Sequence, residues 1–176
     1  MFLGIDCGTQ GLKATAWDPS SREFRVVSQP YTMITGLPPG HQEQHPQIWI
    51  DTLIDCVAKL GTLGVDLKRV EGIGISGQQH GFVPLDSAHK VIRPAKLWCD
   101  TSTAKQCNFI VDSAGGADKY YQMVGNLLPA GFTASKILWL KENEPDNYSK
   151  LQHILLPHDY LNLFLTGETV TEPGDA

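Results

Sequence analysis

The sequence predicts an α/β fold with a mixed sheet, in which antiparallel strands come first and parallel strands follow a helical crossover. The first observation behind this prediction is a series of three short extended segments, at residues 2–5, 11–17 and 24–28. The second is an amphipathic helix at residues 48–60, which precedes a further strand at residues 70–76. A strand, a helix and another strand in that order are typical of a crossover between parallel strands.

The first three strands are predicted to form an antiparallel meander. Residues 2–5 are a short apolar run that ends at the turn residues 6–9, as a buried strand does. Residues 11–17 alternate apolar with small or polar side chains, which is a strand pattern. Turn chemistry follows at Asp18-Pro19-Ser20-Ser21, and residues 24–28 then predict the third strand.

A helix is predicted after a loop at residues 36–45, which holds glycine, two prolines and polar residues. Pro46 suits the start of a helix because its missing N–H needs no partner there. Apolar side chains then recur at helical spacing, at Trp49, Leu53, Val57 and Leu60. Gly61 and Gly64 are predicted to end the helix.

The rest of the chain predicts short strands and helices in alternation. Residues 81–85 resume an extended apolar pattern, and Asp86-Ser87-Ala88 predicts a turn. The further predicted elements are helices at residues 103–111, 135–140 and 158–165, and a short strand at residues 154–156.

The bulk composition is that of an ordinary globular domain, with 176 residues, 41% hydrophobic and 19% charged. The formal net charge of −5 and the lack of a Lys/Arg run argue against nucleic acid as a partner. The four cysteines form no CxxC pair, which favours free thiols in a reducing cytoplasm. No apolar stretch is long enough to span a membrane, so we expect a cytoplasmic protein without a membrane partner.

The first candidate for chemistry is Asp6-Cys7-Gly8-Thr9-Gln10-Gly11, where an apolar strand delivers a carboxylate into a glycine-bearing turn. Glycine lets the backbone approach a ligand closely, and backbone N–H groups and the Thr9 hydroxyl could face phosphate oxygens. Asp6 could hold a magnesium ion, directly or through water. The segment is not a Walker A loop, and on its own an ordinary hairpin turn is the simpler interpretation.

Two further segments carry polar groups suited to a sugar. In the glycine-bracketed segment 77–81, Gln78, Gln79 and His80 offer several donors and acceptors, as a polyhydroxylated substrate requires. The alternative is a polar surface loop. Later, Trp98 could pack against the apolar face of a sugar and Asp100 could bind hydroxyls. A core tryptophan followed by a helix-capping aspartate explains that second pair equally well.

Together and in this order, these segments resemble the FGGY carbohydrate kinases. Residues 3–13 are similar to the family's GIDxGTxxxK phosphate motif, and residues 77–81 are similar to GQMHG or GQQHG. Residues 93–100 resemble RPAILWND, and residues 131–139 resemble GFTAPKLLW. The similarity is strongest to the members that phosphorylate xylulose and covers nearly the whole chain. Shorter similar pieces are residues 43–49, 144–145, 155–161 and 165–168.

This resemblance implies an actin-like ATPase, or ribonuclease-H-like, fold: two such domains with a cleft between them. Residues 1–176 would then form most of the amino-terminal, sugar-side domain, with the second domain absent and the fold incomplete. The implied ligands are ATP, Mg²⁺ and D-xylulose or a related ketose. The implied reaction transfers the γ-phosphoryl group to O5 of D-xylulose, which gives D-xylulose 5-phosphate.

The resemblance also implies a role for individual residues. Asp6 is the catalytic carboxylate on the metal and phosphate side. The implied cofactor-binding residues are Gly8, Thr9 and Gln10. The implied substrate-binding residues are Gln79 and His80, with Trp98 and Asp100 as further candidates for the sugar wall.

The chain departs from the family pattern in a few places. His45 stands where the family usually has Asp, Ile50 where it has a second Trp, and Ser135 where it often has Pro. The general base of the family is an aspartate in a GGGDN-like motif beyond the segment that matches residues 171–176, and no GGGD or GGDN occurs here. We therefore expect this stretch alone to be inactive and to self-associate or dissolve poorly.

Two alternatives stay open. The first is another FGGY kinase that acts on ribulose, gluconate or another polyol. Glycerol is disfavoured because glycerol kinases typically carry an Arg-Glu pair in place of Gln79 and His80. The second is a sugar-binding module that phosphorylates nothing. A homodimer is a further possibility in either case.

Overall fold

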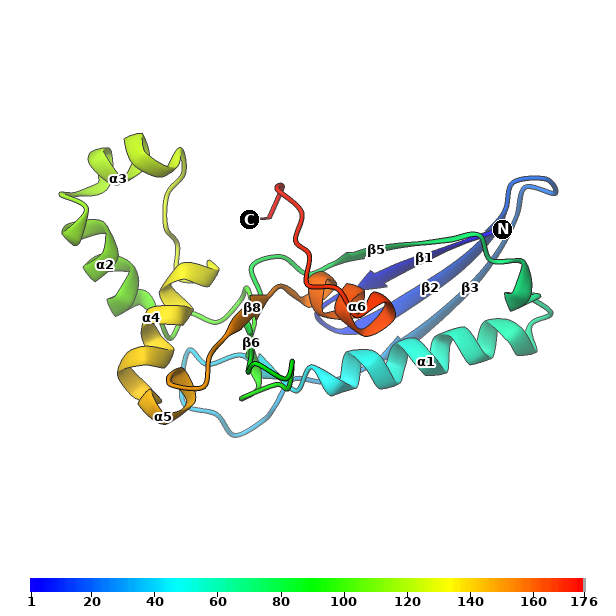
Figure 1. The fold of residues 1–176 in the computed structure, drawn as a ribbon, viewed down its shortest axis with the longest axis horizontal. Helices are drawn as coiled ribbons and strands as arrows, with labels where there is room; N and C mark the ends of the chain where they lie inside the picture. The colour runs from blue at the N-terminus through cyan, green and yellow to red at the C-terminus, as the bar shows by residue number, and fades with distance from the viewer. Residues whose placement is uncertain (176) are drawn as a thin grey trace.

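A four-stranded mixed sheet forms the centre of the fold, in the order β3-β2-β1-β5, in a computed structural model that describes residues 1–175 (Figure 1). Strands β1 (Phe2–Cys7), β2 (Gly11–Asp18) and β3 (Glu23–Pro30) pair antiparallel with their chain neighbours. Strand β5 (Gly72–Gly77) pairs parallel with β1. The predicted meander and the parallel strand after the crossover are both confirmed.

The crossover helix α1 (Gln47–Thr62) covers one face of this sheet and packs against β2 and β3. Strand β1 alternates in burial, so Leu3 and Ile5 face α1 while Asp6 faces the other way. The buried side chains of α1 are Trp49, Ile50, Thr52, Leu53, Cys56 and Leu60. Gly61 lies inside the helix rather than ending it, and the left-handed backbone of Gly64 follows the last turn.

Short strands and helix α6 continue the fold beside β5. Strands β6 (Val83–Leu85) and β8 (His153–Leu155) pair antiparallel, as do β4 (Glu43–Gln44) and β7 (Ala95–Lys96). Helix α6 (Pro157–Thr166) packs against β5 and α1. A 3-10 helix, η1, lies at Leu67–Arg69. Strands β6 and β8 have three residues each, and β4 and β7 have two. Two residues are too few to show an alternating pattern, so the sequence could not reveal β4 and β7 by periodicity.

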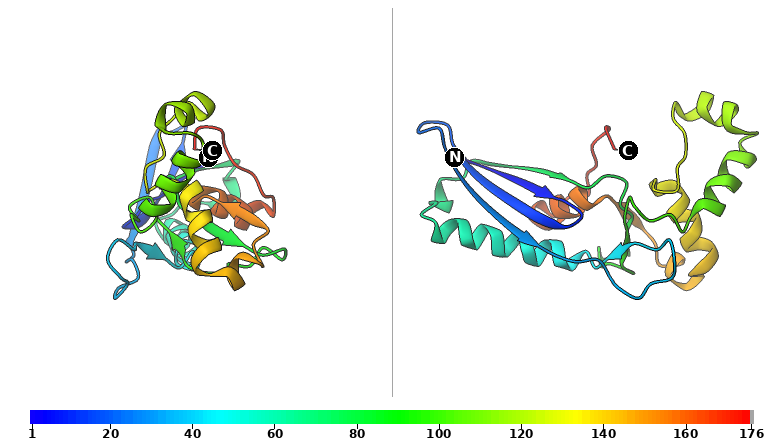
Figure 2. Two further views of the ribbon diagram at one scale, coloured as in Figure 1. Left: turned by 90° about the vertical axis from the view of Figure 1, so that its left-hand side faces the viewer. Right: turned by 180° about the vertical axis from the view of Figure 1, so that it is seen from behind.

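The remaining helices gather at the end of the molecule away from the amino terminus (Figure 2). They are α2 (Ala104–Ser113), α3 (Ala117–Val124), α4 (Thr133–Asn143) and α5 (Pro145–Tyr148). Helices α2 and α4 correspond to predicted helices. Helix α3 was not predicted, although its apolar residues recur at helical spacing, and in the structure it buries none of its side chains. Within residues 1–175, no helix combines the length and the apolar character that a membrane crossing needs.

The sheet face opposite α1 carries exposed aromatic and aliphatic side chains. Phe2 lies across from Trp17, and Trp17 lies across from Phe24, so the three rings form a row over β1, β2 and β3. Val26 extends the row and, like the three rings, is exposed. An apolar surface of this kind supports the expected self-association, which stays a prediction.

A buried ionic network joins β4, β7 and α4. The Lys96 ammonium is fully buried and lies 3.0 Å from Asp100 Oδ2, 3.2 Å from Glu43 Oε1 and 4.0 Å from the centroid of the Trp139 ring. Arg93 bridges the carboxylates of Glu43 and Glu144 at 2.8 and 3.0 Å. The buried carboxylates therefore meet buried cations, which is the condition under which burial of charge is tolerated.

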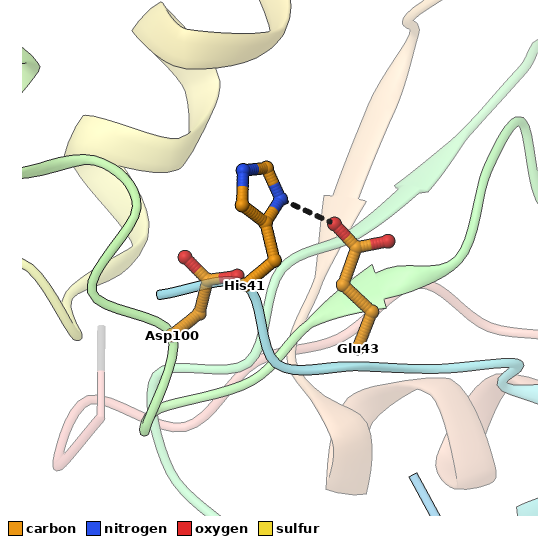
Figure 3. Close-up of side chains that lie close together, drawn as sticks. All are labelled: His41, Glu43 and Asp100. Atoms are coloured by element: carbon orange, nitrogen blue, oxygen red, sulfur yellow. Dashed lines mark ion pairs between the residues drawn. The ribbon is translucent and has the colours of Figure 1, made fainter. Parts of the chain in front are cut away.

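The same cluster brings the ligand atoms of His41, Glu43 and Asp100 within 4.8 Å of one another (Figure 3). Three such groups could bind a metal ion. The Lys96 ammonium, however, lies 3.2 Å from His41 Nδ1 and within ion-pair distance of both carboxylates. The cluster therefore surrounds a buried lysine, and Lys96 and Arg93 together supply positive charge to the two carboxylates.

Replacement of this lysine should destabilise the fold. In Lys96→Met, Glu43 and Asp100 would keep buried negative charge without the ammonium between them. We expect the free energy of unfolding to fall by about 3–5 kcal/mol, measured by urea denaturation. Lys105→Met, at an exposed lysine of α2, is the matched control and should change it by less than about 0.5 kcal/mol. Equal effects of the two variants would contradict the role given to the network.

Candidate functional site

Strand geometry brings the predicted site segments together. Strands β1 and β5 are parallel and in register, with Asp6 opposite Ser76 and Cys7 opposite Gly77, so their carboxyl ends meet at one edge of the sheet. The turn after β1 and the loop after β5 therefore face each other. They enclose a cavity of about 480 Å³ that is lined by Asp6, Gly8, Thr9, Gly77, Gln78, Gln79, His80 and Trp98.

A second hollow adjoins the first on the side of β2 and β3. It has a volume of about 720 Å³ and shares Asp6, Gly8, Thr9 and Trp98 with the first. Gln10 lines this second hollow and not the first. The residues predicted for the phosphate side therefore lie where the two hollows adjoin, and Trp98 lies at the same boundary.

The β1–β2 turn is held from beneath by buried side chains. The Tyr31 hydroxyl donates to the Gly8 carbonyl at 2.6 Å, and Gln44 Nε2 donates to the Thr9 carbonyl at 2.8 Å. Gly11 has to be glycine, because a Cβ there would lie 2.6 Å from the Gln29 carbonyl oxygen. These contacts fix the turn in one position at the mouth of the cavity.

A chain of hydrogen bonds links this turn to the loop after β5. Trp98 Nε1 donates to Thr9 Oγ1 at 2.9 Å, and the Thr9 hydroxyl donates to Gln78 Oε1 at 3.1 Å. Gln78 Nε2 in turn donates to Gln44 Oε1 at 3.2 Å. The buried Trp49 Nε1 donates to that same oxygen at 3.0 Å. We call this chain, Trp98–Thr9–Gln78–Gln44–Trp49, the turn–loop chain.

The turn–loop chain limits what the Thr9 hydroxyl can do. A hydroxyl has one proton, and Thr9 gives that proton to Gln78. Phosphate oxygens are acceptors, so they could take a hydrogen bond from Thr9 Oγ1 only if the Gln78 bond broke. A phosphate at this turn would therefore be held through backbone N–H groups, while the Thr9 side chain orients Trp98.

Asp6 presents a free carboxylate to both hollows. It is exposed because strand alternation turns it away from the core, and Ser76 Oγ lies 3.4 Å from its Oδ1. The antiparallel register places Lys13 directly opposite Asp6 on β2. This carboxylate can thus reach a ligand or a hydrated cation without a change in the fold.

His80 adopts a left-handed backbone conformation, with φ of 55°. Its carbonyl oxygen accepts hydrogen bonds from Lys136 Nζ at 2.6 Å and from Thr133 Oγ1 at 3.2 Å. Its ring packs against Phe132, with ring centroids 4.1 Å apart. A non-glycine residue in this conformation needs such support from its surroundings. Gln79 beside it is exposed and lines the cavity.

Lys136 is a second buried lysine, and it is held differently from Lys96. Its ammonium donates to the carbonyl oxygens of His80 and Gly131, each at 2.6 Å. Among residues 1–175 no carboxylate lies within ion-pair distance of it. Burial lowers the pKa of Lys136 to about 7, although the more distant Asp100 raises it in part. A neutral amine keeps two N–H groups, one for each of these carbonyls.

Asp100 does not line either hollow. It is fully buried, and its carboxylate accepts hydrogen bonds from the Gln42 N–H at 2.9 Å, the Ser102 N–H at 3.0 Å and the Lys96 ammonium. Burial by itself raises the pKa of Asp100, but the hydrogen bonds and the Lys96 charge outweigh it and hold the pKa below its ordinary value. The geometry thus favours the structural role over a sugar contact, with Asp100 ordering the turn that leads into α2.

The other predicted residues all reach the site, and the structure adds four that were not singled out from the sequence: Gln44, Gln78, Lys136 and Asp175. Each acts through another residue. The sequence marks Gln78 as one of three adjacent polar side chains, but it does not distinguish the role of Gln78 from the roles of the other two. The contacts that tie Gln44, Lys136 and Asp175 to the site join residues 34 to 95 positions apart, so no local pattern pointed to these roles.

The pKa of Lys136 predicts a pH-dependent stability. Because the folded pKa lies below that of the unfolded chain, the unfolded chain binds more protons between about pH 7 and pH 10. Relative to Lys136→Met, the wild type should therefore gain roughly 1 kcal/mol in free energy of unfolding per pH unit from about pH 7 to pH 9. Urea denaturation at several pH values measures this. Lys141→Met, at an exposed lysine of the same helix, should show no such slope relative to the wild type. A Lys136→Met difference that is independent of pH would contradict a buried, weakly basic amine.

The chain is similar to known sugar kinases in both sequence and fold. The chain is 40% identical to the xylulose kinase of Haemophilus influenzae over 187 aligned residues, which cover 100% of the chain and 37% of that protein. Its fold matches the crystal structure of a xyloylose kinase from Brucella ovis with a TM-score of 0.86 and 34% identity, over 94% of this chain and 34% of that one. It also matches a gluconate kinase from Lactobacillus acidophilus with a TM-score of 0.82 and 26% identity, over 97% and 34%.

The chain thus spans about a third of the length of these relatives. All of them are sugar or sugar-acid kinases, and the solved structures confirm the expected actin-like fold class. The family model for the N-terminal domain of the FGGY carbohydrate kinases matches residues 1–176. The chain belongs to the FGGY family of carbohydrate kinases.

Proposed function

We propose that these residues form the sugar-side domain of a two-domain kinase that transfers the γ-phosphoryl group of ATP to O5 of D-xylulose. The observation that carries the proposal is the single cavity that joins Asp6 and its glycine-bearing turn to Gln79, His80 and Trp98. The names of the relatives support xylulose as the sugar. Residues 1–176 would be most of the amino-terminal domain.

The sugar side of the cavity suits a neutral polyol. Gln79 carries both a donor and an acceptor, and the His80 ring adds a nitrogen. A sugar hydroxyl can therefore be bound either as a donor or as an acceptor. Trp98 is half exposed at the boundary of the two hollows, and its ring offers an apolar face for the C–H groups of a sugar. Its hydrogen bond to Thr9 fixes the orientation of that face.

The phosphate side suits ATP with Mg²⁺. The exposed Asp6 carboxylate offers the oxygen ligand that Mg²⁺ prefers, directly or through water. Bound Mg²⁺ would neutralise charge on the phosphate oxygens during transfer. Gly8, Thr9 and Gln10 would hold phosphate oxygens by backbone N–H groups, because the Thr9 hydroxyl proton is engaged with Gln78. Lys13, opposite Asp6, adds a positive charge on the same strand pair.

Phosphoryl transfer also needs a base that takes the proton of the sugar hydroxyl. None of the carboxylates described above is placed for this, because each lies on the phosphate side or is engaged with another residue. Asp6 lies on the proposed phosphate side, Asp100 is enclosed with Lys96, and Asp175 contacts Nδ1 of the His80 ring. We therefore propose that the base and the adenosine pocket belong to a second domain of the whole protein. Closure of the two domains over the cavity would exclude water from the transferred phosphoryl group.

A different sugar is the main alternative. The similarity to a gluconate kinase shows that the same fold is compatible with a sugar acid, so the sugar is decided by the side chains of the cavity and not by the fold. A sugar-binding module without turnover is the second alternative, and the exposed Asp6 carboxylate beside the sugar-side residues of the cavity favours the kinase over it. A homodimer stays a prediction.

A substrate panel tests the proposal on the whole protein. ADP release with MgATP should be fastest with D-xylulose and slower with D-ribulose, L-ribulose, D-gluconate and glycerol. His80→Ala should raise the KM for xylulose at least about tenfold, because it removes a side chain that binds the sugar. His45→Ala, at an exposed histidine outside both hollows, is the matched control and should leave KM unchanged. A higher rate with another sugar would refute the assignment of xylulose, and no turnover with any sugar would favour the binding module.

Loss of the Asp6 charge should act on the chemical step. Asp6→Asn keeps the size of the side chain but removes the carboxylate that would hold Mg²⁺, so kcat should fall by about 100-fold or more. The KM for xylulose should change by less than about threefold, because the sugar contacts lie on other residues. Asp18→Asn at the far end of β2 is the control. A kcat of Asp6→Asn within about threefold of the wild type would contradict the role of Asp6.

A further inference from the structure

Asp175 makes a two-point contact with His80 that the proposed function does not explain. Its carboxylate is almost fully buried, with 1% of the side chain exposed, although it lies in a segment without regular secondary structure. One oxygen lies 2.6 Å from His80 Nδ1, and the other accepts the His80 backbone N–H at 3.0 Å. Burial of a carboxylate needs such hydrogen bonds, and here both of them go to a single residue.

This contact determines which nitrogen of the ring carries the proton. A carboxylate 2.6 Å from Nδ1 requires a hydrogen there, because two lone pairs at that distance would repel each other. In the neutral ring the other nitrogen, Nε2, then has a lone pair and is an acceptor. Nδ1 is engaged with Asp175, so Nε2 is the nitrogen that remains for a ligand in the cavity.

The position of the ring depends on the same contact. The left-handed backbone of His80 is held at its N–H by Asp175 and at its carbonyl by Lys136 and Thr133. Phe132 packs against the face of the ring, and a ring–ring contact of this kind does not distinguish the two orientations that a 180° turn about the Cβ–Cγ bond exchanges. Asp175 is the group that distinguishes the two ring nitrogens, because it bonds Nδ1 alone.

We propose that Asp175 is a positioning residue that holds His80 in its Nδ1–H tautomer, so that Nε2 accepts a hydrogen bond from a hydroxyl group of the sugar. The proposal rests on the proposed function of the cavity. It assigns the segment around Asp175 a part in sugar recognition, although Asp175 lines neither hollow itself. An acceptor nitrogen favours a hydroxyl donor over a carboxylate at that point of the substrate.

The tautomer can be measured without turnover. The whole protein is labelled with ¹⁵N-histidine, and the His80 signals are assigned by comparison with His80→Gln. The two ring nitrogens are then read by NMR over a pH series, and the tautomer is taken from the spectra in which the ring has lost its second proton. The Nδ1–H tautomer alone is the expected result. An Nε2–H tautomer, or a mixture of both, would overturn the proposal whatever the substrate of the protein is.

Asp175→Asn tests the consequence for the sugar. An asparagine replaces one of the two carboxylate oxygens by an NH₂ donor, which would face either the backbone N–H or Nδ1 of His80. We expect the KM for D-xylulose to rise about tenfold or more while kcat changes less than about threefold, together with a mixed tautomer of His80. Glu172→Gln is the matched control, because that exposed acid bonds only the N–H of Gly174 among the described residues. It should leave both readouts unchanged.

The outcomes separate this proposal from the proposed function. An unchanged KM in Asp175→Asn, or a loss of kcat without a change in KM, would overturn the positioning role. If no sugar is phosphorylated but the wild-type ring is Nδ1–H, the kinase assignment fails and the contact between Asp175 and His80 stands. If Asp175→Asn does not fold, the tautomer of the wild-type protein still decides the proposal.

Discussion

The turn–loop chain is the interaction on which the site depends. It begins at Trp98 on the cavity wall, passes through the Thr9 hydroxyl and two glutamine side chains, and ends at Trp49 in the core. Gln44 is fully buried and uses its oxygen twice and its nitrogen once, so it is tied to the turn, the loop and the helix at the same time. The turn after β1 and the loop after β5, which come from different strands, are thereby linked to each other. The proposed phosphoryl transfer would need such a link, because the reacting groups have to be aligned before transfer.

Two buried lysines support the site in different ways. Lys96 is neutralised by two carboxylates and by the Trp139 ring, and it fastens the strand that leads to Trp98. Lys136 has carbonyl oxygens as partners and fastens the loop that carries His80. The first arrangement keeps a full charge inside the protein, whereas the second lowers the pKa of the amine to about 7. Both lysines thus anchor parts of the cavity wall to the buried interior of the fold.

The sequence predicted most of the fold because its strands and its long helix are regular. The alternation in residues 2–17 and the helical spacing of Trp49, Leu53 and Leu60 follow directly from which face is buried. A strand of two residues, such as β4, left no periodic signal, whereas α3 was missed although its apolar residues recur at helical spacing. For the site, glycine-flanked polar residues identified Asp6, Thr9 and His80. For Asp100 the two interpretations stayed equal, since a carboxylate after a strand has the same local sequence whether it faces a ligand or a buried lysine. Asp175 and Gln44 could not be found, because their roles arise from contacts 95 and 34 residues away.

The most direct test of this account is a crystal structure of the whole protein with D-xylulose and a non-hydrolysable ATP analogue bound. The account predicts the sugar between Trp98 and the Gln79–His80 pair, the terminal phosphate at the Gly8–Gln10 turn, and an intact hydrogen bond between Thr9 and Gln78. A sugar bound outside this cavity, or a phosphate held by the Thr9 hydroxyl with the turn–loop chain broken, would contradict it.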